Sequence, residues 1–315
     1  MKLGIILDPL DRINTKKDST YAMMVEAQQR GHEIFTMQQG DLAYADGRVL
    51  AQMTPLQITH DKTHWYAAQA PLELPLNALD VVLMRKDPPF DMEYIYSTYL
   101  LERAQQQGVK VVNDPRALRD HNEKFAITEF PDLIPPTLVT RDAGRIRAFV
   151  AQQGDAILKP LDGMGGSRIF RVRHGDLNLN VIMETLTQHG HHTIMVQRYV
   201  PEIADGDKRI LLIGGEVVPY LLARIPVAGE HRGNLAAGAR SEVRPLSPRD
   251  WDIARALAPQ MLQRGLVLVG LDVIGDYMTE LNVTSPTCFQ EISQGSDCNV
   301  AGMMLDALER LVESG

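Results

Sequence analysis

The chain has 315 residues, 44% of them hydrophobic and 23% charged, and its formal net charge is −8. This length allows about two domains, or three small ones, with ample hydrophobic core. The negative charge argues against a general nucleic-acid-binding protein, which needs a basic face for the phosphates. No apolar run is long enough to predict a transmembrane helix, and the first residues lack a signal peptide pattern. Because Cys288 and Cys298 are not spaced like metal ligands, we expect free thiols and a cytoplasmic protein.

The first 120 residues alternate apolar runs with helical patterns, which is typical of a doubly wound α/β domain. Ser19 has the position of a helix N-cap, and Gly31 follows as the helix terminator. The stretch 41–75 has no clear pattern. We expect strands at 3–7, 32–37, 80–84 and 109–112, and helices at 21–30 and 93–107.

After residue 115 short strands and tight glycine turns dominate, which predicts antiparallel α+β structure. The glycine content of segment 225–240 is typical of a loop that closes over a site. We expect strands at 156–159, 168–172, 193–197, 209–213 and 217–220, and helices at 123–130, 248–263 and 300–312. The predicted division is 1–122, 123–196 and 197–315.

A glycine-rich loop between two predicted strands suggests a phosphate site. Gly163, Gly165 and Gly166 lie in this loop, and Lys159 ends the strand before it. The loop is neither a Walker A motif nor a dinucleotide fingerprint, because the following stretch is strand-like. Glycines allow backbone N–H groups to approach phosphate oxygens closely. The alternative is an ordinary glycine-rich turn with a surface lysine.

Segment 266–286 reads as two strands joined by a short turn, with Asp272, Glu280 and Asn282 on them. Glu280 and Asn282 are two residues apart and share one face of a strand. A clean two-residue turn would place Asp272 opposite Thr279, whereas an odd-length or bulged turn through Tyr277 would place it opposite Glu280. We predict the second arrangement, because it creates an oxygen site for a divalent cation such as Mg²⁺. The alternative is a solvated hairpin edge.

Several basic residues complete the candidate set. Lys124, Arg209, Arg224 and Arg232 are each unremarkable in isolation, since single basic residues are usually solvated. Taken with the glycine loop and the acidic hairpin, they fit a nucleoside triphosphate whose γ-phosphoryl group is bridged to metal ions.

Four strings in the right order give a specific resemblance. They are LMRKDPPFD at 83–91, LKPLDGMGG at 158–166, RGNLAAGAR at 232–240 and GLDVIGDYMTELNVTSPT at 270–287. The chain resembles the bacterial glutathione synthetases of the ATP-grasp superfamily over nearly its whole length. The resemblance implies a pre-ATP-grasp α/β domain followed by an ATP-grasp fold of two α+β subdomains. It also implies ATP-dependent joining of γ-glutamylcysteine to glycine with Mg²⁺, or with Mn²⁺, in a tetramer that binds neither nucleic acid nor membrane.

The resemblance also implies roles for individual residues. Asp272, Glu280 and Asn282 hold the metal ion; Lys124, Lys159, Gly163, Gly165 and Gly166 contact the ATP phosphates; Gln197, Tyr199 and Val200 line the adenine; Asp207 reaches the ribose; Arg209 and Arg232 act in catalysis; and Arg224, Ile225, Arg232 and Asn282 contact the substrates. The resemblance further implies that segment 225–240 closes over the substrates.

The chain departs from the family pattern at Ala239, at Gln290 and over 293–299. Alanine at 239 stiffens the loop slightly, and the other differences affect subunit contacts. Arg85 and Lys86 follow a predicted strand and either attract the substrate carboxylates or only pack structurally. Rival functions are another carboxylate–amine ligase, such as a D-alanine–D-alanine or glutamate-adding ligase, and a non-catalytic ATP-binding module. His189, His191 and His192 form either a metal site or, more commonly for such a turn, a surface loop.

Overall fold

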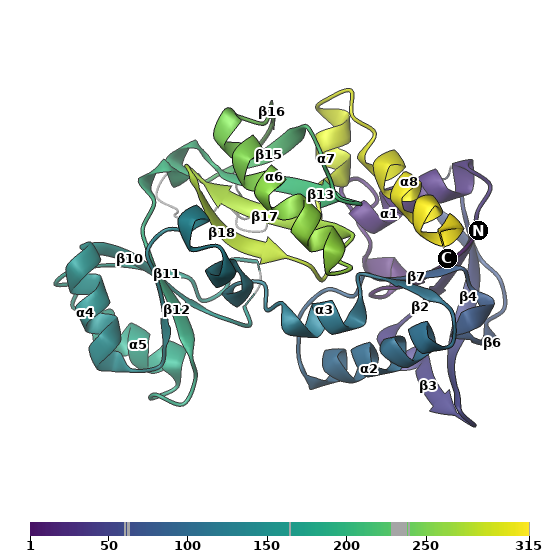
Figure 1. Cartoon of the computed structure of the whole chain (residues 1–315), viewed down its shortest axis with the longest axis horizontal. Coiled ribbons are helices and arrows are strands. Elements are labelled where there is room, and N and C mark those ends of the chain that lie inside the picture. The colour runs from purple at the N-terminus through teal and green to yellow at the C-terminus, as the bar shows by residue number, and fades with distance from the viewer. Residues whose placement is uncertain (60, 62–63, 164, 228–237, 239, 315) are drawn as a thin grey trace.

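The computed structural model describes residues 1–59, 61, 64–163, 165–227, 238 and 240–314. Three sheets make up this part of the chain, and Figure 1 shows them as three bodies side by side. The N-terminal sheet has a parallel core in the order β2-β1-β7-β8. Its strands are β1 (Lys2–Ile6), β2 (Glu33–Met37), β7 (Val81–Met84) and β8 (Lys110–Val112).

Helices cover both faces of this parallel core. Met23 of α1 (Ser19–Gln29) packs in a cluster with Leu3 and Ile5 of β1. Leu101 of α2 (Met92–Gln106) packs in another cluster with Ile6. Because neighbouring strand residues point to opposite faces, the two helices lie on opposite sides, and the doubly wound prediction is confirmed. The N-cap of α1 is Asp18 rather than the predicted Ser19, since the Asp18 carboxylate accepts the backbone N–H of Tyr21.

The unassigned stretch 41–75 extends this sheet with antiparallel strands. The longest, β4 (Arg48–Ile58), pairs with β2 on one side. Pro55 lies inside β4, and a proline within a run argues against a strand in sequence analysis. The other strands here are β3 (Leu42–Ala45), β5 (Tyr66–Ala68) and β6 (Leu72–Pro75), all paired with β4.

The central sheet is antiparallel in the order β11-β10-β12-β9. Its strands are β9 (Thr137–Thr140), β10 (Asp155–Pro160), β11 (Phe170–Arg173) and β12 (Ile194–Arg198). The helices α4 (Ala143–Gln153) and α5 (Leu179–Thr187) pack on one face, together with Ala156 and Leu158. The alternate residues of β10, Ile157 and Lys159, therefore face the other way, toward a cavity. The predicted boundary between 196 and 197 falls inside β12.

The third sheet has the order β16-β15-β13-β17-β18 and holds most of the candidate site. Its strands are β13 (Asp207–Ile213), β14 (Glu216–Val217), β15 (Tyr220–Ile225), β16 (Arg240–Pro245), β17 (Leu268–Ile274) and β18 (Tyr277–Asn282). The expected strand at 217–220 is wrong, because the chain leaves β14 at Val217 and starts β15 at Tyr220. Pro219 lies between them and has no N–H for the ladder.

The remaining elements connect or cover the sheets. The helices are α3 (Pro115–Asp120), α6 (Pro248–Gln263), α7 (Phe289–Gln294) and α8 (Val300–Glu313). The predicted helix at 123–130 is only the 3₁₀ turn Phe125–Glu129. Other 3₁₀ turns are Leu10–Arg12, Gln39–Asp41, Leu76–Ala78, Pro131–Leu133 and Pro201–Asp205. Within the described residues, no helix is both long and apolar enough to cross a bilayer.

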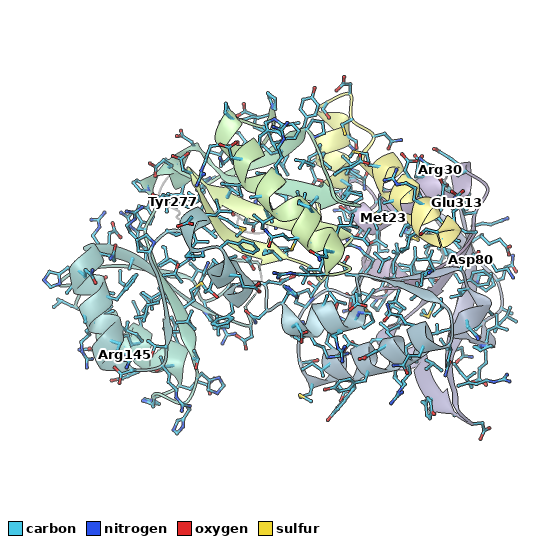
Figure 2. All side chains as sticks on the ribbon, viewed as in Figure 1. Met23, Arg30, Asp80, Arg145, Tyr277 and Glu313 are labelled. Atoms are coloured by element: carbon cyan, nitrogen blue, oxygen red, sulfur yellow. The ribbon has the colours of Figure 1, made fainter. Side chains whose placement is uncertain are left out.

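The last helix, α8, packs against α1 of the N-terminal domain, as Figures 1 and 2 show. Arg30 at the end of α1 contacts Asp306 at 2.6 Å and Glu309 at 3.0 Å. His32 reaches the same Glu309 at 2.8 Å. The two ends of the chain are thus joined in one structural unit.

Candidate active site

The hairpin of β17 and β18 carries the predicted metal ligands Asp272, Glu280 and Asn282 on one face. The predicted pairing is confirmed, since Asp272 lies directly opposite Glu280. The turn itself has two residues, and an irregularity next to Asp272 leaves Thr279 without a counterpart. The predicted place of the bulge, in the turn through Tyr277, is therefore wrong, because the extra residue is taken up inside the strand pair.

Lys159 contacts this bulge. Its ammonium group donates a hydrogen bond of 3.0 Å to the carbonyl of Thr279, the residue that the ladder leaves out. Burial lowers the pKa of Lys159 to about 8, although the nearby Glu280 carboxylate raises it. The interpretation of Lys159 as an ordinary surface lysine is excluded, because its side chain is buried.

Asp272 on β17 is held by two arginines, Arg209 of the adjacent strand β13 and Arg224 of the next strand, β15. The Nε of Arg209 donates to its Oδ1 at 2.6 Å, and Arg224 approaches its Oδ2 to 3.0 Å. Arg224 also pairs with Asp207 at 2.6 Å. Gly270 makes room for this cluster, since a Cβ there would lie only 3.1 Å from the Cδ of Arg209. The four charged groups form one buried network at the base of the site.

The charges of this network oppose the effect of burial. Burial raises the pKa of a carboxyl group, but Arg209 and Arg224 hold the pKa of Asp272 well below its usual range. The pKa of Asp207 changes in the opposite direction. Burial raises it to about 6, although the positive charge of Arg224 lowers it. The Oδ1 of Asp207 is buried and has no hydrogen-bond partner among the described residues. A buried carboxylate oxygen without a partner at the wall of a cavity is available to accept a hydrogen bond from a polar ligand.

Lys124 joins the glycine loop to the acidic hairpin. Its ammonium group lies 2.9 Å from Glu280 and also donates to the carbonyl of Gly163. Burial would lower the pKa of Lys124, but Glu280 beside it raises the pKa overall. The general expectation that a single lysine is solvated therefore fails at Lys124, which is buried and paired.

The glycine loop connects β10 to β11, which pair as an antiparallel hairpin, as predicted. Gly165 and Gly166 have positive φ angles of 62° and 77°, which favour glycine. A Cβ at Gly163 would lie 2.9 Å from the ring of Pro160. The three glycines line the cavity together with Ser167, and without side chains they allow a ligand to approach the backbone closely.

A cavity of about 330 Å³ brings these residues together, which is within the usual range for small-molecule sites, roughly 300–1,000 Å³. The end of β12 forms another part of its wall. Gln197 donates to the hydroxyl of Thr137, and the guanidinium of Arg171 stacks 3.5 Å from the ring centre of Tyr199. The predicted residues that line the cavity are Lys124, Lys159, Gly163, Gly165, Gly166, Gln197, Tyr199, Val200, Asp207, Arg209, Arg224, Asp272, Glu280 and Asn282.

One predicted substrate residue that the structure describes is not part of this wall. Ile225 ends β15 opposite Arg240 and is not among the described residues that line the cavity. Arg232, Ala239 and most of the predicted loop 225–240 lie outside the described residues. The contribution of this loop therefore stays a prediction.

Glu123 was not predicted from the sequence, and the fold places it in the wall of the cavity. Its Oε1 accepts hydrogen bonds from the backbone N–H groups of Val283 at 2.8 Å and Thr284 at 3.0 Å, and from the Thr284 hydroxyl at 2.9 Å. Its own carbonyl accepts the N–H of Leu281 at 2.8 Å. Glu123 thus holds the end of β18 beside Lys124, and its position directly before Lys124 was the only available signal.

The two basic residues after β7 have different environments. Arg85 is buried and donates to the Thr20 hydroxyl at 3.0 Å and to the Pro286 carbonyl at 2.9 Å. Burial lowers its pKa, and its Nη1 has no hydrogen-bond partner among the described residues. Lys86 instead pairs with Asp8 at 3.0 Å and links two loops.

Two further features have structural roles within the chain. Gln290, which we connected with subunit contacts, donates to the carbonyls of Thr15 and Asp18 and ties α7 to the loop after β1. The three histidines at 189, 191 and 192 lie in an exposed turn after α5. Among the described residues, no group of three or more His, Cys, Asp or Glu side chains could hold a metal ion, so the histidine site is not supported.

Comparison with known proteins gives the family. The model of the prokaryotic glutathione synthetase N-terminal domain matches residues 1–119, and that of the prokaryotic glutathione synthetase ATP-grasp domain matches 123–297. The chain belongs to the prokaryotic glutathione synthetase family. It is 59% identical to a glutathione synthetase of Ralstonia nicotianae over 98% of this chain and 96% of that one. It is 56% identical to that of Shewanella oneidensis over 98% of both chains.

Membership of the glutathione synthetase family makes the chain an ATP-dependent ligase that forms glutathione. The predicted family and ATP-grasp fold are thereby confirmed, and the rival ligases and the non-catalytic module are not supported. Solved structures show the same fold at low identity. An ATP-grasp ligase solved with a precursor peptide and AMPPNP has a TM-score of 0.64 at 18% identity, covering 99% of this chain and 98% of that one. A D-cycloserine synthetase has a TM-score of 0.68 at 13% identity, with coverage of 98% and 99%.

Proposed function

We propose that the cavity binds ATP beside the carboxylate of γ-glutamylcysteine and couples that carboxylate to the amine of glycine. The burial of four basic side chains around one cavity carries this proposal. Lys124, Lys159, Arg209 and Arg224 are each only 4–6% exposed. Burying cations is unfavourable unless anions compensate them, and Lys159 donates its hydrogen bond to a neutral carbonyl rather than to an anion. A triphosphate and a substrate carboxylate supply suitable anions.

The two lysines and the glycine loop support a phosphate site at the β10–β11 hairpin. Ammonium groups act as point charges toward phosphate oxygens, and exposed backbone N–H groups add donors. The end of β12 supports an adenine site, with apolar Val200 next to backbone groups. The unpartnered Oδ1 of Asp207 supports a hydrogen bond to the ribose. The ATP contacts are then Lys124, Lys159, Gly163, Gly165, Gly166, Gln197, Tyr199, Val200 and Asp207.

The oxygen-bearing face of the hairpin fits a Mg²⁺ ion, and the same ligands suit Mn²⁺. Two carboxylates, Asp272 and Glu280, lie opposite each other. The amide N–H of Asn282 donates to Gly270, which directs its oxygen away from that carbonyl. Mg²⁺ usually takes one or two protein carboxylates and completes its shell with water and phosphate oxygens. When bound, the ion neutralises charge on the phosphates that the lysines contact.

The chemistry requires activation of an inert acid, because oxide is a very poor leaving group. Attack of the cysteinyl carboxylate on the γ-phosphorus of ATP forms an acyl phosphate and releases ADP. Arg209, fixed by Asp272, is placed to stabilise the negative charge that spreads over the phosphoryl oxygens. The glycine amine then attacks the acyl carbon, and phosphate leaves. Arg224 and Asn282, and in the predicted loop Ile225 and Arg232, are proposed to hold the substrates during this step.

Acyl phosphates hydrolyse readily, so the second step must exclude water. The predicted loop 225–240 is the proposed cover, with Arg232 supplying a further positive charge. We also propose that the enzyme is cytoplasmic and a homo-oligomer, a tetramer as the family resemblance implies. The division into 1–122, 123–196 and 197–315 is likewise a proposal; its second boundary falls within β12, which ends at Arg198.

A phosphate-release assay with γ-glutamylcysteine and ATP tests the proposed function. Glycine should support rapid release together with formation of glutathione, whereas alanine and serine should support much less. Hydroxylamine added in place of glycine should trap the acyl phosphate as a hydroxamate. Arg209→Ala should lower both products by about 10²–10³, the usual cost of losing one stabilising donor. Full activity of this variant would disprove the role of Arg209.

A further inference from the structure

Gln197 lies in the middle of a row of side chains that crosses the central sheet. It is paired with Ile157 of β10 on one side and with Thr137 of β9 on the other. Directly paired residues of antiparallel strands point to the same face, so the row lies on the cavity side of the sheet. The helices α4 and α5 pack on the opposite face, and Figure 1 shows them on the outer side of this sheet, away from the third sheet.

Two hydrogen bonds fix which way round the amide group of Gln197 lies. The hydroxyl of Thr137 donates to the carbonyl of Pro135 at 2.7 Å, and a carbonyl oxygen can only accept. The single proton of this hydroxyl is therefore in use, so Thr137 can offer Gln197 only a lone pair. The amide NH₂ of Gln197 donates to that lone pair at 3.1 Å, which turns the amide oxygen away from Thr137.

The amide oxygen of Gln197 is left available for a ligand. Within the described part of the chain it accepts no hydrogen bond, and it is not among the buried polar atoms that lack a partner, so it is accessible from the cavity. The side chains of Ile157, Val200 and Ile203 give this cavity apolar wall as well. An acceptor in such surroundings favours a ligand that presents a donor, because two facing acceptors leave both groups unpaired.

We propose that Thr137 is a positioning residue that makes the nucleotide site selective for a purine with an amino group at C6. Its hydroxyl holds the amide oxygen of Gln197 toward the base, where this oxygen accepts a hydrogen bond from the amino group of adenine. A purine with an oxygen at C6, such as hypoxanthine or guanine, would bring two acceptors together. Thr137 acts through Gln197, since it is not itself among the described residues that line the cavity.

This inference rests on the proposed ATP site, in which Gln197 contacts the adenine, and it deepens that proposal by assigning the selection of the base. It does not depend on the proposed ligase chemistry. Nucleoside diphosphates occupy the same base site without reacting, so base selection can be measured apart from turnover.

Isothermal titration calorimetry of the full chain with ADP and with inosine diphosphate tests the role of Thr137. These nucleotides carry an amino group and an oxygen at C6. The wild type should bind ADP at least about tenfold more tightly, because one hydrogen bond is made and one pair of facing acceptors is avoided. Thr137→Val keeps the shape of the side chain without its hydroxyl, so the amide can turn round and the preference should fall to about twofold or less. Thr137→Ser retains the hydroxyl and should keep the wild-type preference.

Thr140→Val is the matched control. Thr140 lies on the same strand but on the other face, and its hydroxyl accepts the backbone N–H of Asp142 at 3.1 Å. The same substitution there should leave the preference for ADP unchanged. Purine riboside diphosphate, which has only hydrogen at C6, should bind with an affinity between the other two in the wild type. Thr137→Ala also lacks the hydroxyl and replaces Thr137→Val if the valine variant does not fold.

Three results would overturn the role of Thr137: a wild type that binds ADP and inosine diphosphate equally tightly, a Thr137→Val variant that keeps the wild-type preference, or one that binds both nucleotides more weakly by the same factor. The last result would show that Thr137 only stabilises the sheet. Phosphate release with ATP, γ-glutamylcysteine and glycine separates the two proposals. An active enzyme without base selectivity disproves the role of Thr137 alone, whereas an inactive enzyme with the expected binding pattern disproves the ligase mechanism alone.

Discussion

Lys159 shows how burial at a single residue sets the pH response of a binding site. Its ammonium group is buried beside Thr279, and this lowers its pKa to about 8. A bound triphosphate favours the charged ammonium form. Above pH 8, ATP binding must therefore take up a proton, and the affinity for ATP should fall as pH rises, by up to about tenfold per unit. Below that pH this group is already charged and should contribute no pH dependence.

Isothermal titration calorimetry of ATP binding between pH 7 and 9.5, in buffers with different ionisation enthalpies, measures this proton uptake. Lys159→Gln serves as the control, because it lacks the titrating group and should bind more weakly with no uptake near pH 8. The same uptake in the Lys159→Gln variant would show that another group titrates there.

Glu123 is a positioning residue whose contribution can be separated from folding. Glu123→Ala leaves the buried N–H groups of Val283 and Thr284 without their acceptor, which costs about 1–3 kcal/mol. It also loosens Asn282 and should raise the Mg²⁺ concentration needed for half-maximal rate about 10–100-fold. Glu123→Gln retains an oxygen acceptor and should restore most of the response. If the alanine variant has a wild-type Mg²⁺ titration but a lower melting temperature, the effect of Glu123 is on stability alone.

At the scale of elements, residue spacing alone did not determine the register in which the strands of the β17–β18 hairpin pair. The two-residue spacing of Glu280 and Asn282 placed them on one face in advance. Whether Asp272 lies opposite Thr279 or Glu280 depended on one extra residue in the hairpin, and the local sequence was compatible with both registers. The bulge at Thr279 has a contact from outside the hairpin: the Thr279 carbonyl accepts a hydrogen bond from the ammonium group of Lys159 in another sheet.

The proposed chemistry requires a cover that excludes water from the acyl phosphate, and the loop between β15 and β16 is the proposed cover. Its ends, Ile225 and Arg240, are paired across the two strands, so a short turn can replace 228–237 without opening the sheet. If the loop excludes water from the acyl phosphate, its removal should increase hydrolysis severalfold relative to peptide formation. The ratio of phosphate released to glutathione formed measures this coupling. A ratio that stays near one in the shortened enzyme would contradict the proposed cover.

At the scale of the whole molecule, the N-terminal domain depends on the last helix. Leu305 and Met304 of α8 belong to the same buried cluster as Leu3, Ile5 and Met23. The core of the first domain is therefore completed by residues almost 300 positions away. The first and last segments of the chain therefore contribute side chains to one common core.

Leu305→Ala tests this dependence. Leu305 is fully buried, and its truncation should lower the free energy of unfolding by about 2–5 kcal/mol. Trp65 lies in the same cluster, whereas Trp251 packs with the C-terminal sheet, so the two tryptophans report on different parts. Urea denaturation of Trp65→Phe and Trp251→Phe backgrounds should give equal shifts for both signals. Leu177→Ala, at a side chain that is 97% exposed, is the matched control and should shift neither. A shift confined to Trp65 would mean that the two parts unfold independently.

Sequence reasoning predicted the family, the parallel N-terminal core and about half of the described residues that line the cavity. Buried parallel strands are continuous apolar runs in the sequence. The glycine loop and the acidic hairpin are short motifs, so the residues that give them their chemistry lie close together in the sequence. The three-dimensional structure was needed for the features that depend on contacts between distant segments. It paired Lys124 with Glu280, gave Glu123 its role, formed β4 despite Pro55, and packed α8 on the first domain. These contacts join residues tens to hundreds of positions apart, and local pattern carries no information about which of them will meet.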